Sequence, residues 1–170
     1  SVTFGEGITT SGILLLGGRN ILTDTEASLA SFDKDYTITV KSGSWSYIRG
    51  GNRRASGSSP VGTISGNVTV VIEGGTFNST NASNTMSAGG MSSHTGNVTM
   101  IINGGTVSGD IYGAGRIGSN STKTKQVYSG KTSIVINGGK LMGKTLAAVQ
   151  ETDSCSFTGE FSLTISEAAA

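Results

Sequence analysis

A ten-residue segment, GNVTMIINGG at residues 96–105, recurs along the chain and constrains the fold more than any other feature. Two close copies flank it, GNVTVVIEGG at 66–75 and GKTSIVINGG at 130–139. Two weaker copies extend the series, KDYTITVKSG at 34–43 and GEFSLTISEA at 159–168, and successive copies start 32, 30, 34 and 29 residues apart. Repeats of this length are typical of stacked structural units, each of which needs its neighbours to bury its apolar face.

Alignment of the five copies separates their positions into two alternating sets. One set is mainly aliphatic or aromatic, and its last member in each copy is Val40, Ile72, Ile102, Ile136 and Ile165. The other set begins with a hydroxyl-bearing residue, namely Thr37, Thr69, Thr99, Ser133 and Ser162. It continues two residues later with a β-branched residue, namely Thr39, Val71, Ile101, Val135 and Thr164. Because a period of two indicates a β-strand, each copy is expected to be a strand with an apolar inner face and an outer face open to water.

A corner is expected after each strand. A glycine stands three residues after the last inward aliphatic residue in four copies, where the backbone can take a positive φ. Two residues later comes a second inward column, made of Trp45, Phe77, Val107 and Leu141. One coil per repeat, with like residues above like, predicts an all-β, right-handed parallel β-helix of about five coils. A propeller, with about 40 residues per blade, and an antiparallel sandwich fit the pattern less well.

The repeats occupy residues 34–167 and form the predicted β-helix. Residues 1–33 are expected to be an irregular N-terminal cap with a partial coil, because ILLLGG at 13–18 echoes SYIRGG at 46–51. Residues 168–170 are three alanines, which are interpreted as a linker or a cloning scar.

Composition excludes several functional classes. The chain has 170 residues with 27 glycines and one proline, and a formal net charge of +1, which is not the basic balance of a nucleic-acid binder. No apolar run of about 18 residues is present, so no membrane span is expected. Cys155 is the only cysteine, so no internal disulfide or cysteine metal site can form, and no cofactor is expected. Abundant serine, threonine, asparagine and glycine with few charges favour an extracellular or cell-surface location.

The Gly-Gly-Thr-Phe segment at 74–77 and the Gly-Gly-Thr-Val segment at 104–107 carry a resemblance to a known group of proteins. Over residues 34–167 the chain resembles the Gly-Gly-Thr-Val/Phe repeats of secreted and cell-surface proteins of anaerobic gut and rumen bacteria. The resemblance implies a fold similar to the pectin-lyase-like β-helix. It also implies a bacterial module attached to a polysaccharide-degrading system, such as a cellulosome-associated protein.

Basic residues gather near the second corner of each coil and are the main candidates for ligand binding. Stacked in register, they would line one long edge, where planar guanidinium groups could hold the carboxylates of an acidic polysaccharide such as a pectin. Tyr112 stands beside a turn, where a phenol presents an apolar face together with a hydroxyl. The predicted polysaccharide-binding residues are therefore Arg49, Arg53, Arg54, Tyr112 and Arg116. The alternative is scattered solubilising charge that keeps a solenoid from self-association.

Catalysis is not expected. A pectin-lyase-like enzyme needs clustered acids on the outer face of its strands, whereas the outer columns here are hydroxyl-bearing and aliphatic. Asp33 and Asp35 could hold a cation weakly, although a polar loop is the simpler interpretation, and no metal site is predicted. His94 and Cys155 lie two coils apart, which argues against a catalytic dyad. Trp45 aligns with core positions and is therefore expected to pack inside.

Two functional hypotheses follow, with a third from the enzyme class. The first is a non-catalytic module of a larger secreted bacterial protein, for polysaccharide binding or adhesion. The second is a purely structural stalk that spaces other domains of a surface protein. The third is a polysaccharide lyase or hydrolase. Val71, Ile101 and Val135 form an exposed apolar strip, which is expected to pack on another segment, module or subunit and could support self-association.

Overall fold

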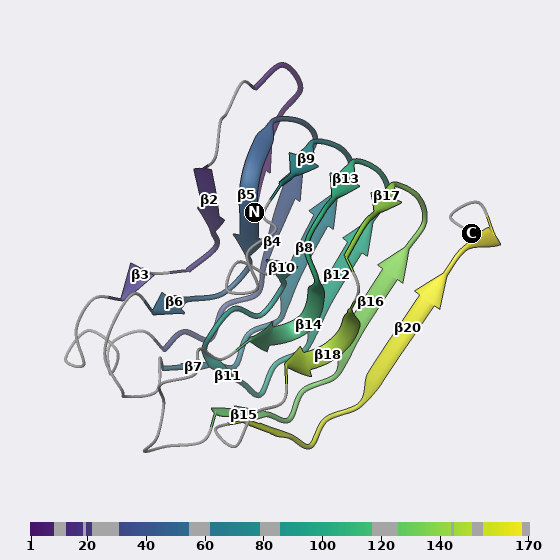
Figure 1. Ribbon diagram of the computed structural model, residues 1–170. Coiled ribbons are helices and arrows are strands. Elements are labelled where there is room, and N and C mark those ends of the chain that lie inside the picture. The colour runs from purple at the N-terminus through teal and green to yellow at the C-terminus, as the bar shows by residue number, and fades with distance from the viewer. Residues whose placement is uncertain are drawn as a thin grey trace.

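A computed structural model describes residues 1–8, 13–18, 20–21, 31–54, 62–78, 86–116, 126–143, 145–150 and 155–167. Parallel strands coil into a β-solenoid of about four turns, which confirms the predicted parallel β-helix (Figure 1). The sequence predicted about five coils. The count is lower because the fifth copy of the repeat contributes only its first strand, at Phe161–Ile165, to the described stack.

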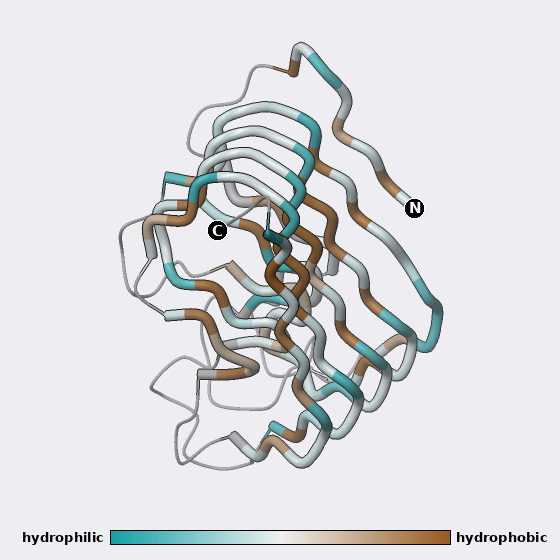
Figure 2. Tube along the Cα trace, turned by 90° about the vertical axis from the view of Figure 1, so that its right-hand side faces the viewer, coloured by the Kyte–Doolittle hydropathy of each residue, from teal (hydrophilic) through white to brown (hydrophobic). Residues whose placement is uncertain are grey.

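The first sheet contains the five copies of the repeat and one strand before them. Its strands, in spatial order, are β1 (Val2–Phe4), β4 (Tyr36–Val40), β8 (Val68–Ile72), β12 (Val98–Ile102), β16 (Thr132–Ile136) and β20 (Phe161–Ile165). The register is the one that the alignment predicts, with Ile72 beside Ile102 and Ile102 beside Ile136. All three are buried. Figure 2 shows hydrophobic stretches recurring at matching places in successive coils.

The other sheets are built from shorter strands. The second sheet contains β2 (Ile13–Leu16), β5 (Ser44–Arg49), β9 (Thr76–Phe77), β10 (Met86–Ser87), β13 (Thr106–Val107), β14 (Ile111–Arg116), β17 (Lys140–Leu141) and β18 (Leu146–Gln150). The third contains β7 (Thr63–Ile64), β11 (Ser93–His94), β15 (Gln126–Tyr128) and β19 (Cys155–Phe157). A small fourth sheet pairs β3 (Asn20–Ile21) with β6 (Arg53–Arg54).

The corner between the first and second sheets depends on glycine. Gly105 has a φ of 83°, and a Cβ atom there would lie 2.7 Å from the carbonyl oxygen of Gly75 in the neighbouring coil. Its counterparts Gly43, Gly75 and Gly139 also have positive φ. Because a side chain would meet both backbone strain and a close neighbour, the corner needs glycine for conformation and for spacing. The second inward column follows as predicted, with Trp45 and Phe77 buried side by side.

The N-terminal residues join the solenoid earlier than the sequence suggested. β1 pairs with β4, so Val2 lies beside Ile38 in the first sheet. Phe4 packs edge-on against Trp45, with 5.3 Å between ring centroids. β2 pairs with β5 at the predicted spacing of 33 residues, which confirms the echo between the two segments. The first strand was missed because three residues are too few to show a period of two.

Candidate binding site

The structure encloses two of the five predicted ligand-binding residues. Arg49 and Tyr112 share one column, because each pairs with Ser87 of β10. Their side chains are only 5% and 7% exposed. The Arg49 guanidinium lies 5.1 Å from the centre of the Tyr47 ring, and its Nη1 atom is 2.9 Å from the sulfur of Met91. Neither Arg49 nor Tyr112 therefore contributes to an exposed edge.

Burial at this place has a structural cause that the repeat pattern did not reveal. In a strand, only one of two neighbouring residues is expected to point inward. The structure nevertheless buries both members of the pair Tyr47 and Ile48, and both members of the pair Ile111 and Tyr112. Pairing between β2 and β5 shifts register near Trp45, as at a β-bulge. Arg49 was predicted to be exposed because it lies beside a turn. Its burial depends on packing against other coils, which the repeat pattern does not report.

The other predicted arginines lie at the corner that follows. Arg53 is half-buried on β6, where it pairs with Asn20 of β3. Arg116 ends β14 and pairs with Gln150 of β18. For Arg54 and Arg116 the structure describes the backbone and not the side chain. A binding edge made of Arg53, Arg54 and Arg116 therefore stays a prediction.

A buried polar cluster between the second and third sheets was not anticipated. His94 is enclosed, and its Nε2–H donates a 2.6 Å hydrogen bond to the carbonyl oxygen of Gly89. Its ring stacks on Tyr128, with 5.9 Å between centroids and 11° between planes. Tyr128 donates to the Oε1 atom of Gln126, and the Gln126 amide donates to the carbonyl oxygen of Met91. The cluster joins two successive coils through the buried hydrogen bond from Gln126 to Met91 and the stacked rings of His94 and Tyr128, which is a structural role.

Burial also sets the protonation state of this histidine. Because the Gly89 carbonyl can only accept, Nε2 carries the proton and Nδ1 has a lone pair, for which the described part of the chain provides no hydrogen-bond partner. Burial lowers the pKa of His94 from 6.5 to about 4, so the ring is neutral at pH 7. The register places Cys155 beside Gln126, whereas His94 pairs with Tyr128.

The outer face of the first sheet carries two regular rows of side chains. The hydroxyl row is Thr37, Thr69, Thr99, Ser133 and Ser162. Beside it, the aliphatic row consists of Val71, Ile101 and Val135, with a threonine at each end. Most of these side chains are half-exposed, and Ser162 donates a 2.9 Å hydrogen bond to Ser133. Since parallel strands lie about 4.8 Å apart, both rows repeat at that spacing along the solenoid axis.

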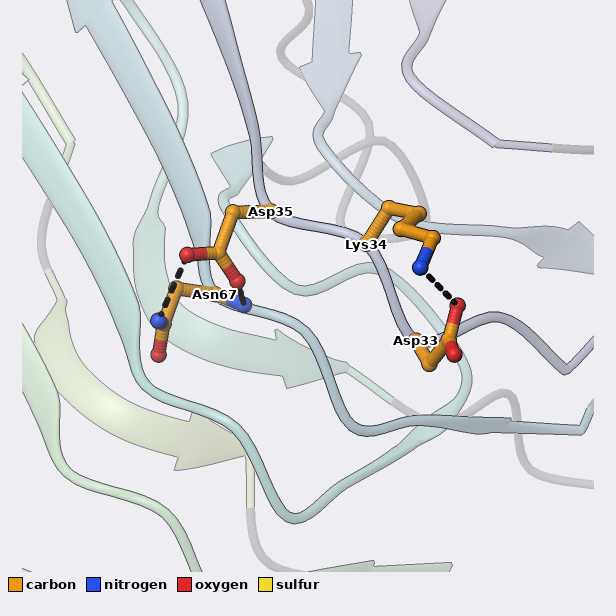
Figure 3. A network of polar contacts seen from close by, with 4 residues as sticks. All are labelled: Asp33, Lys34, Asp35 and Asn67. Atoms are coloured by element: carbon orange, nitrogen blue, oxygen red, sulfur yellow. Dashed lines mark hydrogen bonds and ion pairs between the residues drawn. The ribbon is translucent and has the colours of Figure 1, made fainter.

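A ladder of side-chain to backbone hydrogen bonds runs along one edge of this face. Asn67 accepts from the backbone N–H of Asn97 at 2.9 Å, and Asn97 accepts from the N–H of Lys131 at 3.0 Å. The first rung is Asp35, which accepts from the backbone N–H of Asn67 at 2.7 Å and from its side-chain amide at 3.1 Å (Figure 3). Each of these hydrogen bonds joins one coil to the next. The sequence feature that could have predicted the ladder is the Asp or Asn that recurs just before the strand.

The acidic pair considered for a cation takes part in other contacts. Both oxygens of Asp35 accept hydrogen bonds from Asn67, and the backbone N–H is the main reason why the pKa of Asp35 lies below 3.8. Asp33 lies 3.8 Å from the ammonium group of Lys34 (Figure 3). Both carboxylates therefore have partners within the protein, which fits the interpretation of this segment as a polar loop.

In the described ranges, no three residues of the His, Cys, Asp and Glu types are grouped as metal ligands would be. No helix among these residues is long and apolar enough to cross a membrane. The fold places the protein in the class of parallel β-helices. The chain matches no known protein family, no curated protein and no solved structure.

Proposed function

We propose that this protein is a non-catalytic extracellular or cell-surface module that binds polysaccharide along the outer face of its first sheet. The observation that carries the proposal is the pair of parallel rows on that face. Threonine and serine hydroxyls repeat strand after strand beside Val71, Ile101 and Val135. A linear polysaccharide also repeats hydroxyl groups and apolar C–H surfaces along its length. A chain lying along the solenoid axis could therefore make the same contacts at each coil.

Repetition matters because each contact is weak. A hydrogen bond made in exchange for water contributes only about 1 kcal/mol, and a partly exposed aliphatic side chain adds a similar amount. Binding through this face would therefore need several coils at once. Polymers are expected to bind and their monosaccharides are not. The arginine edge of Arg53, Arg54 and Arg116 remains a second candidate, and its charge would favour an acidic polymer.

Binding can be tested on a glycan array, followed by calorimetry with neutral and acidic polysaccharides. We expect micromolar binding that a double variant, Thr99→Lys with Ile101→Lys, weakens by about tenfold or more, or at least about 1.4 kcal/mol. Thr106→Lys is the matched control, because Thr106 is a half-exposed threonine on the second sheet. If binding survives in the double variant but is lost in Arg53→Ala with Arg54→Ala, the site is the arginine edge.

The alternative is a structural stalk of a surface protein. It is favoured by the ladder through Asn67 and Asn97, in which polar side chains at the surface bind the next coil and stabilise the stacking. A protein that binds no polysaccharide on the array would favour this alternative and contradict the binding proposal. Calcium-dependent release of unsaturated sugar from pectin would contradict both, since it would require a lyase.

A further inference from the structure

A third row of side chains flanks the aliphatic row on the outer face of the first sheet. The residue after each repeat strand continues the parallel pairing, because the backbone N–H of Asn103 donates to the carbonyl oxygen of Ile72 at 2.7 Å. The same bond joins Asn137 to Ile102, also at 2.7 Å. These residues lie two positions after the aliphatic row and therefore on the same face. We define the polar row as Lys41, Glu73, Asn103, Asn137 and Ser166.

Contacts between neighbours hold the polar row in register. The ammonium group of Lys41 lies 3.9 Å from the carboxylate of Glu73. The Nδ2 atom of Asn137 donates a 2.8 Å hydrogen bond to Oδ1 of Asn103. All four residues are exposed, and their side chains are longer than those of threonine and valine. The aliphatic row therefore lies between short hydroxyl groups on one side and longer polar groups on the other.

The charges on this face favour a neutral ligand. No member of the hydroxyl row or the aliphatic row is charged. At one margin, Lys41 lies beside Glu73 in the polar row. At the other margin, the column that contains the asparagine ladder has two acids and one lysine, namely Asp35, Glu160 and Lys131. An acidic polymer would bring its carboxylates close to three acids and only two lysines, and like charges disfavour such a contact.

The spacing of the rows favours an extended chain. Each row follows the solenoid axis in register and repeats once per coil, at about 4.8 Å. Pyranose units joined by equatorial bonds at C1 and C4 form a flat ribbon, in which each unit advances by nearly this distance. An axial bond at C1, as in an α-1,4-linked glucan, makes the chain curve into a helix that departs from such a row. Only the extended ribbon keeps the same contacts from coil to coil.

The order of the rows selects the configuration of the sugar ring. A pyranose whose hydroxyl groups are all equatorial has C–H groups on both faces and its hydroxyl groups around the edge. Laid on Ile101, such a ring places C–H groups on the aliphatic row, one hydroxyl edge near Thr99 and the other near Asn103. In a two-fold ribbon the two ring faces alternate along the row. An axial hydroxyl group would therefore point at aliphatic side chains at every second coil and lose its hydrogen bonds with water.

We propose that the polysaccharide site described above, on which this inference rests, binds a neutral β-1,4-linked polymer with equatorial hydroxyl groups, of the glucan or xylan type. The polymer lies along the solenoid axis with one sugar unit per coil. Each coil contributes one hydroxyl-bearing residue, one β-branched residue and one residue of the polar row. Because each row has five members, a chain of five sugar units fills the face.

Calorimetry with oligosaccharides of defined length tests the ligand class on the full chain. We expect the affinity for β-1,4-linked gluco-oligosaccharides to rise from the dimer to the pentamer by at least about tenfold and then to level off. The α-1,4-linked gluco-oligosaccharides are the matched control, because they contain the same sugar, and their pentamer should bind at least about tenfold more weakly. Oligogalacturonates of the same length, which are acidic, should also bind more weakly than the β-linked series.

The Asn103→Ala variant tests the polar row at the middle coil. Loss of one hydrogen-bonding side chain should weaken the binding of the β-linked pentamer by about fivefold. Thr106→Ala is the control, because Thr106 is half-exposed on the second sheet and its replacement should leave the affinity unchanged. Equal affinities of Asn103→Ala and the wild type would overturn the proposal. The wild-type length series remains decisive if a variant fails to fold.

Failure of the ligand class can be told apart from failure of the polysaccharide site. If α-linked oligosaccharides or oligogalacturonates bind as tightly as the β-linked series, the protein binds carbohydrate but the proposed class is wrong. The same conclusion follows if the affinity for the β-linked series stops rising at the dimer. If no oligosaccharide and no polysaccharide binds, both proposals fail.

Discussion

At the scale of single residues, polar side chains act as ties between coils. Asn97 joins two coils by accepting a backbone hydrogen bond from Lys131, while its own N–H donates to Asn67. Asn52 also joins two coils inside the molecule, but through a contact between side chains, in which its Nδ2 donates to the hydroxyl of Ser92 at 2.7 Å. Because backbone groups at a coil boundary must find partners, such side chains stabilise the stack without adding apolar area.

Removing one rung of the ladder should lower stability modestly. Asn97→Ala deletes the acceptor for the N–H of Lys131, and we expect the free energy of unfolding to fall by about 1 kcal/mol. Asn97→Asp keeps an oxygen in place, as Asp35 does at the equivalent position of an earlier coil, and should restore most of the loss. Urea unfolding of the three proteins measures this. An Asn97→Asp variant as unstable as Asn97→Ala would show that the acceptor is not what matters.

His94 predicts how stability depends on pH. Its pKa is about 4 in the folded state and 6.5 as a free side chain, so the unfolded chain binds a proton before the folded chain does. The contribution of His94 to the free energy of unfolding is therefore fully present well above pH 6.5 and is lost as the pH decreases towards 4. The loss is about 3 kcal/mol, since each pKa unit corresponds to about 1.4 kcal/mol. Unfolding by urea at several pH values, on wild type and His94→Phe, measures this contribution.

The replacement His94→Phe keeps an aromatic ring against Tyr128 and removes the titration. The loss between pH 6.5 and 4 should disappear in this variant. Asp35 does not interfere, because its pKa is lowered from 3.8 and its own contribution is lost at more acid pH. An unchanged pH profile in His94→Phe would mean that other groups cause the acid sensitivity.

At the scale of elements, neighbouring residues of one strand have opposite environments. Ile102 is fully buried between Ile72 and Ile136, whereas Ile101 is half-exposed on the outer face. Ile102→Ala should cost about 3 kcal/mol through lost burial and a cavity. Ile101→Ala should cost about 1 kcal/mol or less, mainly through β-propensity. Thermal unfolding of the pair tests the orientation of β12, and equal losses would contradict it.

The five repeat strands of the first sheet could be predicted from sequence because five residues suffice to show a period of two, whereas the three residues of β1 do not. β8, β12 and β16 were found together with their partners, since a column of like residues is visible in an alignment. The third sheet was not predicted. Strands of two or three residues, such as β11, carry no period, and their pairing depends on neighbours in space.

The candidate site was less predictable than the fold. Arg49 was expected at an edge because it precedes a glycine pair, yet the structure buries it against Met91 and Tyr47. Burial of an arginine depends on side chains from other coils, which single-sequence patterns do not report. The hydroxyl row was predicted from the sequence as an outward column, and the register of the first sheet confirms it.

At the scale of the whole molecule, one geometric rule explains the core and the outer face. Each coil lies directly on the previous one, so equal positions of the repeat become neighbours. Inside, this produces aliphatic columns, and outside, the hydroxyl and aliphatic rows on which the proposed polysaccharide site depends. The proposed polysaccharide site therefore depends on in-register parallel stacking.

Engineered disulfides measure this stacking most directly. Cα atoms of paired residues in adjacent parallel strands lie about 4.8 Å apart, within the range of about 4.4–6.8 Å that a disulfide spans. In a Cys155→Ser background, the double variant Thr69→Cys with Thr99→Cys should oxidise to a disulfide without loss of fold, because the two threonines are directly paired. Thr69→Cys with Ser133→Cys should stay reduced, since Thr99 separates the two positions. A disulfide in the second variant and none in the first would contradict the stacked coils.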